Sequence, residues 1–196
     1  VSSPESNISQ KLPPSSQEES SDSAESVGSS ESSGQAEQGQ VVTITFPEGE
    51  SLTEIFAALE ENGVSTFDEL MSMAENYDYS YYPLVAAAPS SGRCFRLEGY
   101  LFPDTYTFYL GENPKYVLNK MLNNFDNKME DYLDQFTEES TYSLHDIVTI
   151  ASMIQKETDG QDYGTIASVI FNRLENTSAE TAGFLQIDAT LVYING

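Results

Sequence analysis

Acidic side chains are the residues most able to do chemistry in this chain. The sequence contains one histidine, His145, and one cysteine, Cys94. Zinc sites built from histidines and Ser-His-Asp machinery therefore have at most one candidate residue each. There is also no Walker loop and no GxGxxG pattern. What remains is carboxylate chemistry, which is typical of glycosidic bond cleavage, and we expect neither a cofactor nor a metal site.

Glu157 is the leading carboxylate. Ile147, Ile150, Met153 and Ile154 recur at the spacing of one helix face, and Glu157 continues that face. A half-buried carboxyl group holds its proton more readily, as a general acid at neutral pH requires. Alternatively, the helix frays at this point and the side chain reaches solvent. The spacing alone leaves both interpretations open.

Three further carboxylates could accompany it. Glu98 and Asp104 lie inside an otherwise apolar and aromatic segment, residues 96–108. In such a segment a carboxylate can instead bond nearby backbone N–H groups at a turn or strand edge. Asp188 could cap a final short helical turn.

The elements that position these residues are mostly predicted to be helices. A Ser or Thr followed three residues later by Glu or Asp marks a helix start, and it occurs at Ser51 with Glu54, Thr66 with Glu69, and Ser143 with Asp146. Apolar periodicity predicts two more helices, from Asn113-Pro114 to about 133 and from about 161 to 174. Residues 41–46, VVTITF, read as a strand, and residues 83–92 as a small-residue loop.

Composition limits the possible partners. The chain has 196 residues and a formal charge of -24, which argues against nucleic acid and against anionic lipid surfaces. Residues 1–40 are rich in Ser and Glu, and we expect a disordered acidic linker there. A single cysteine excludes an internal disulfide, and no apolar run approaches a membrane span.

Several motifs together resemble one family. EGYLFPDTYTF at 98–108, ASMIQKET at 151–158, IASVIFNRL at 166–174 and LQIDATLVY at 185–193 resemble, in this order, the endolytic murein transglycosylase (YceG-like) family. FPEGESLTEIFAALEENGV at 46–64 looks like the LysM-like subdomain that precedes the catalytic domain in that family. The resemblance covers roughly residues 41–196.

The resemblance implies an α+β fold. It consists of a small LysM-like α/β module with its connecting loop at 41–92, and a mainly helical catalytic domain with short strands at 93–196. It further implies a peptidoglycan lytic transglycosylase that cleaves between N-acetylmuramic acid and N-acetylglucosamine without water and leaves 1,6-anhydro ends. Glu157 maps onto the catalytic residue, partly buried against Ile150, Met153 and Ile154. By the same resemblance, the residues expected to line the substrate groove are Glu98, Tyr100, Asp104, Gln186, Asp188 and Thr190.

The chain also departs from the family pattern, at Gln155, Ile187 and Ala189. A C-terminal segment and an N-terminal membrane anchor of the family are not in this sequence, so we expect a truncated catalytic domain whose own activity is open. The implied partners are peptidoglycan glycan strands and the cell-wall synthesis machinery, and the implied place is the extracytoplasmic side of a single-pass membrane anchor. The alternative is a non-catalytic peptidoglycan-binding or scaffolding module, and a hydrolase is a third possibility.

Overall fold

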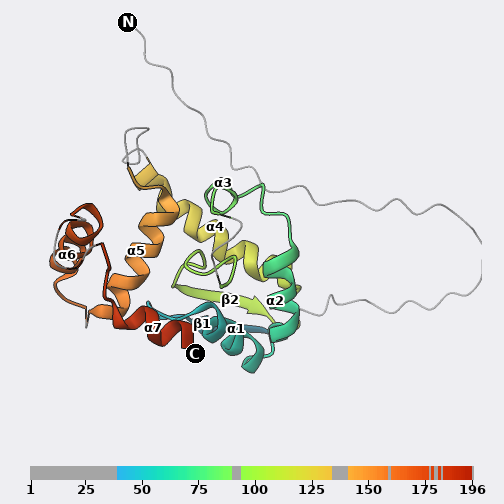
Figure 1. Ribbon diagram of the computed structural model, residues 1–196. Helices are drawn as coiled ribbons and strands as arrows, with labels where there is room; N and C mark the ends of the chain where they lie inside the picture. Colours follow the sequence, from blue (N-terminus) through green and yellow to red (C-terminus); the bar gives the residue numbers. More distant parts are fainter. Residues whose placement is uncertain are drawn as a thin grey trace, which may run out of the picture. The chain divides into compact units, whose positions relative to one another are not determined.

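The architecture is α+β, with two strands and seven helices among the described residues (Figure 1). The computed structural model describes residues 39–89, 94–133, 141–158, 160–176, 178, 181 and 183–195. The expected disordered linker lies, apart from residues 39 and 40, outside the described residues. In chain order the elements are β1 (Val41–Thr45), α1 (Leu52–Glu61), α2 (Phe67–Asn76), α3 (Pro83–Ala86), β2 (Thr105–Tyr109), α4 (Pro114–Leu133), α5 (Leu144–Glu157), α6 (Tyr163–Glu175) and α7 (Asp188–Asn195).

The sheet joins two distant stretches of sequence. β1 pairs antiparallel with β2, in register from Val41 opposite Tyr109 to Thr45 opposite Thr105. Alternate side chains such as Ile44 enter the core, as the period of two in a strand requires. On the other face the hydroxyls of Thr45 and Thr105 lie 2.8 Å apart. The strand at 41–45 confirms the sequence prediction, whereas its pairing with β2 was not predicted.

One hydrophobic core spans the predicted boundary between residues 92 and 93. It combines buried side chains of β1, α1, α2, β2 and α4, and Gln38–Gly196 form one compact unit. Its fully buried large side chains are Tyr79, Tyr82, Tyr100, Phe56, Phe108, Leu52, Leu59, Leu70, Leu97, Leu118, Met121 and Leu122. Described residues on both sides of this predicted boundary therefore contribute to one core cluster.

The three predicted helix starts are confirmed. Capping boxes at Ser51, Thr66 and Ser143 open α1, α2 and α5, each with its acidic partner three residues later. The prediction of a loop throughout 83–92 was wrong, because residues 83–86 form the single helical turn α3. Pro83 at its first position explains the turn, since proline's fixed φ suits a helix start.

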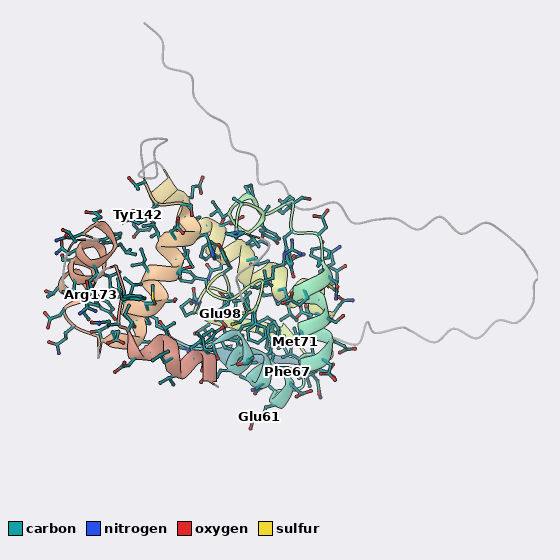
Figure 2. The ribbon with its side chains drawn as sticks, viewed as in Figure 1. Glu61, Phe67, Met71, Glu98, Tyr142 and Arg173 are labelled. Carbon is teal, nitrogen blue, oxygen red and sulfur yellow. The ribbon has the colours of Figure 1, made fainter. Side chains whose placement is uncertain are left out.

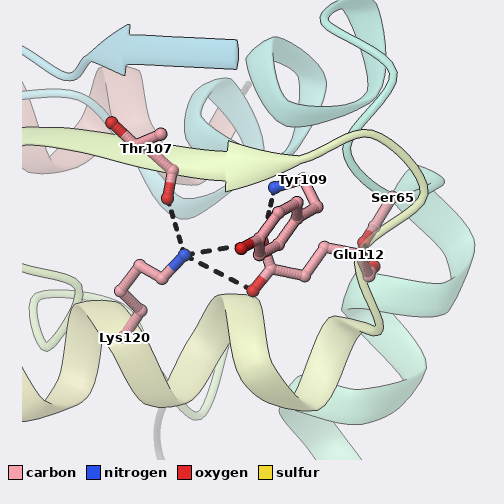
Figure 3. Close-up of polar contacts among 5 residues, drawn as sticks. All are labelled: Ser65, Thr107, Tyr109, Glu112 and Lys120. Atoms are coloured by element: carbon pink, nitrogen blue, oxygen red, sulfur yellow. Dashed lines mark hydrogen bonds and ion pairs between the residues drawn. The ribbon is translucent and has the colours of Figure 1, made fainter. Parts of the chain in front are cut away.

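A lysine joins α4 to the sheet. Lys120 Nζ donates to the Thr107 carbonyl oxygen at 2.6 Å and pairs with the Glu112 carboxylate at 3.4 Å (Figure 3). The same carboxylate accepts from the Tyr109 backbone N–H at 2.8 Å, and Ser65 donates to the Glu112 carbonyl oxygen. The turn after β2 is therefore fixed to both neighbouring segments.

The C-terminal part of the chain packs around α5, which contacts both α6 and α7. Ile150 of α5 and Ile170 of α6 are buried. Gly99 lies close to α5, because a Cβ added there would lie 2.8 Å from Val148 Cγ1, and its φ of +84° favours glycine. In the part of the chain that the structure describes, no helix combines the length and apolar character needed to cross a bilayer.

Candidate active site

Glu157 is the last residue of α5, and its side chain is exposed. The expectation of partial burial was therefore wrong, and the alternative of a solvent-reaching carboxylate holds. The reason is that the apolar stripe loses its cover toward the end of the helix. Ile150 is buried, whereas Met153 and Ile154 are only half-buried.

The start of α7 contacts Glu157 directly. The Ala189 backbone N–H donates to Glu157 Oε1 at 3.3 Å. The first N–H groups of a helix lack partners within the helix and point toward a carboxylate placed there. Asp188 and Thr190 flank Ala189, and Gln186, with a φ of +54°, precedes the helix. Three of the predicted groove residues thus belong to the segment that adjoins Glu157.

Glu98, labelled in Figure 2, lies against the other end of α7. Tyr193 Oη donates to Glu98 Oε2 at 2.9 Å. Both oxygens of Glu98 also accept from the Leu52 backbone N–H at 3.2 Å, at the start of α1. This carboxylate is therefore shared between two helix segments that are far apart in sequence.

Tyr100 and Asp104 are engaged elsewhere. Tyr100 has no exposed surface, and its hydroxyl lies 2.9 Å from Nδ1 of His145, whose ring stacks on it. Asp104 accepts from the Thr105 backbone N–H at 2.7 Å and from Asn124 Nδ2 at 3.0 Å. The bond from the Thr105 backbone N–H has the larger effect and the bond from Asn124 the smaller one, and both lower the pKa of the Asp104 carboxyl group. Neither set of contacts reaches Glu157, so a direct role for these two in a groove remains a prediction.

Two neighbours of the end of α5 were not anticipated. Gln155 packs on the β1–α1 turn, where a Cβ added to Gly49 would lie 3.5 Å from Gln155 Cγ. Glu50, next in that turn, has a buried Oε2 without a hydrogen-bond partner among the described residues. Burial, followed by the Glu54 charge, raises the pKa of Glu50, and Lys156 opposes this. The family resemblance assigned residues 46–64 to a LysM-like subdomain, and only tertiary packing brings the first turn of this segment to α5.

The Glu157 side chain faces solvent. Two shallow hollows of about 460 and 640 Å³ share Glu69, Asn113 and Pro114 in their linings, and none of the candidate residues lines them. In the described ranges no group of three His, Cys, Asp or Glu side chains is arranged to hold a metal ion. The arrangement can thus offer a solvent-facing carboxyl group, oriented by a helix N-terminus, for proton exchange with a bound molecule.

Comparison with known proteins identifies the family of this chain. The model of the YceG-like family matches residues 19–196. The chain belongs to the YceG-like family. An endolytic murein transglycosylase of Bacillus subtilis (strain 168) is 28% identical over 169 residues, which cover 81% of this chain and 45% of the relative. One from Streptococcus pneumoniae serotype 2 (strain D39) is 28% identical over 170 residues, covering 80% and 30%.

A solved structure supports the same relationship. The crystal structure of a putative YceG-like protein from Listeria monocytogenes matches with a TM-score of 0.66 and 28% identity, over 79% of this chain and 52% of that one. This YceG-like chain therefore spans about half the length of the solved relative and less than half of the two transglycosylases.

Proposed function

We propose that this chain carries the catalytic carboxylate of an endolytic peptidoglycan lytic transglycosylase. The observation that carries the proposal is Glu157, exposed at the end of α5 and hydrogen-bonded at the start of α7. The family membership supports it, since relatives with 28% identity are named endolytic murein transglycosylases.

The proposed reaction needs one carboxyl group. In the complex, where the bound strand covers the otherwise exposed side chain, protonated Glu157 donates its proton to the glycosidic oxygen as the bond from C1 of N-acetylmuramic acid to that oxygen breaks. The C6 hydroxyl of the same sugar then bonds to C1, and its proton returns to the Glu157 carboxylate. No water is consumed, the product end is a 1,6-anhydro sugar, and the enzyme is regenerated. A hydrolase would instead require an activated water molecule.

The remaining candidates have supporting roles in this proposal. Asp188 and Thr190 flank Ala189, whose N–H contacts Glu157, and Gln186 precedes the same helix, so we assign these three to substrate binding. Glu98, Tyr100 and Asp104 are proposed to shape the same groove through the segments they hold. The unit from β1 through α2, closed by β2, is proposed to be the LysM-like module of the family.

Location and partners follow from the substrate. Murein lies outside the cytoplasmic membrane, so the described region is proposed to face the extracytoplasmic side, on a protein anchored by a segment preceding this sequence. Nascent glycan strands would then be terminated or trimmed beside the machinery that makes them.

The test is a digest of purified glycan strands. Mass spectrometry separates 1,6-anhydro ends, expected for the transglycosylase, from the reducing ends of a hydrolase. Reducing ends alone would overturn the proposed reaction. Binding to strands without any new ends would instead favour a peptidoglycan-binding module, which is the alternative function.

A further inference from the structure

Helix α7 is held at two points on one face. Ala189 and Tyr193 are four residues apart, so they lie one above the other on the helix. At the first position the backbone N–H contacts Glu157, and at the second the phenol contacts Glu98. Val192, between them in sequence, is 72% exposed. Helix α7 is thus tied to the rest of the chain near both of its ends, by a backbone N–H in its first turn and by the Tyr193 side chain in its last.

Glu98 is a rigid anchor for this helix. Its carboxylate also accepts from Leu52, a residue only 1% exposed at the start of α1. The backbone beside it is fixed as well, because Gly99 has a φ of +84° and lies against Val148 of α5. Glu98 therefore links the last turn of α7 to the start of α1.

The hydroxyl of Tyr193 remains a hydrogen-bond donor at neutral pH. Burial, and then the hydrogen bond and charge of Glu98, raise the pKa of Tyr193, so its hydroxyl keeps its proton throughout the neutral range. A hydroxyl that donates to a carboxylate forms one of the stronger kinds of hydrogen bond.

We infer that Tyr193 is a positioning residue of the reaction. Its bond to Glu98 sets the rotation and depth of α7, and α7 in turn aims the Ala189 N–H at the Glu157 carboxylate. Tyr193 acts through the helix and touches no reacting atom. This inference rests on the proposed function of Glu157.

The kinetic test compares Tyr193→Phe with Tyr163→Phe in the 196-residue chain. The two tyrosines are matched in exposure, at 40% and 41%. For Tyr193→Phe we expect kcat for anhydro-end formation to fall about tenfold while KM changes less than twofold, because misplacement of a catalytic group mainly slows the chemical step. Tyr163→Phe should leave both unchanged. A parental kcat, or a loss explained by a smaller folded fraction, overturns the inference.

Glu98→Ala tests the coupling. If Tyr193 acts through Glu98, adding Tyr193→Phe to Glu98→Ala should lower kcat no further. If the two substitutions lower kcat independently, so that their fold-losses multiply in the double variant, Tyr193 does not act through Glu98.

An activity-free measurement separates this inference from the function on which it rests. Amide hydrogen exchange by NMR should show the Ala189 N–H exchanging about fivefold faster in Tyr193→Phe, with Leu52 unchanged, because a typical hydrogen bond contributes that much to protection. If the parent forms no anhydro ends, the proposed function fails, yet faster exchange at Ala189 still supports the positioning. Unchanged exchange at Ala189 refutes it.

Discussion

The Glu157 carboxylate accepts the backbone N–H of Ala189 at 3.3 Å, across 32 positions of sequence. This contact fixes the orientation of a side chain that is otherwise open to solvent. It also makes one substitution unusually informative, since a glutamine at 157 keeps an oxygen that can accept the same N–H.

Glu157→Gln should therefore remove proton exchange while preserving local geometry. We expect anhydro-end formation to fall about 100-fold or more, the range typical of a lost general acid–base group. Product ends counted by mass spectrometry, with circular dichroism for the fold, make the measurement. Glu61→Gln, an exposed glutamate with the same charge change, should be neutral. Gln155→Ala should be much milder than Glu157→Gln. If Glu157→Gln keeps the parental activity, the assignment of Glu157 is wrong, and Glu98 or Asp104 is the next carboxylate to substitute.

Gly99→Ala should destabilise the fold by about 2–4 kcal/mol. The new methyl group meets Val148 at 2.8 Å, and the positive φ strains any side chain. Gly111→Ala is the matched control, because its φ is +70° but nothing lies within 4 Å of the added Cβ. It should cost only about 1 kcal/mol. Urea unfolding measures both, and equal losses would mean that the contact with α5 contributes nothing.

Asp126→Asn should stabilise the protein at neutral pH. Burial raises the pKa of Asp126 to about 6, and its Oδ1 lacks a hydrogen-bond partner among the described residues. A carboxyl group whose pKa is higher in the folded state than in the unfolded state contributes its full stability at a pH below the unfolded-state pKa. That contribution is lost as the pH rises through the folded-state pKa. The variant should gain about 1 kcal/mol at pH 7, a figure reduced because the side chain is only partly buried, and nothing below about pH 4. Melting temperatures across this range test it, with exposed Glu130→Gln as control. A gain that persists at low pH would exclude this cause.

Ser143→Ala should weaken the helix that carries Glu157 by about 1 kcal/mol. The Ser143 hydroxyl, and then its backbone N–H, lower the pKa of Asp146 from its usual 3.8. A lowered folded pKa contributes stability above the unfolded value that disappears as the pH falls, so the penalty should shrink below about pH 4. Denaturant unfolding at pH 7 and pH 3 compares the two. Ser152→Ala in the same helix should not destabilise, because alanine favours an exposed helix interior; an equal loss there would argue against a capping effect.

Helix starts were predictable because they depend on residues three positions apart. The box of Ser143 and Asp146 needs no knowledge of the rest of the fold, and the same holds for Ser51 and Glu54. The exposure of Glu157 was not predictable in this way. Periodicity shows which face a residue shares, whereas burial depends on what packs against that face at each turn.

The contacts between the site residues were even harder to predict from the sequence. Glu98 and Tyr193 are 95 positions apart, and each has an ordinary alternative use. The motifs could group Glu98 with Asp188 by family resemblance, but they could not distinguish a side chain in the groove from one that anchors a helix. That distinction depends on the partner of each oxygen atom.

The pairing of β1 with β2 has a consequence for how the chain acquires its fold. Thr45 and Thr105 bond although they are 60 positions apart, so the first strand must wait for most of the core to be synthesised. Closing a loop of that length costs roughly 3.6 kcal/mol of chain entropy beyond a constant. Contacts of such long sequence separation slow folding, whereas α1 and α2 can form locally beforehand. The two-stranded sheet should therefore be a late step of folding, and until then the edge of β1 is open to pairing with other chains.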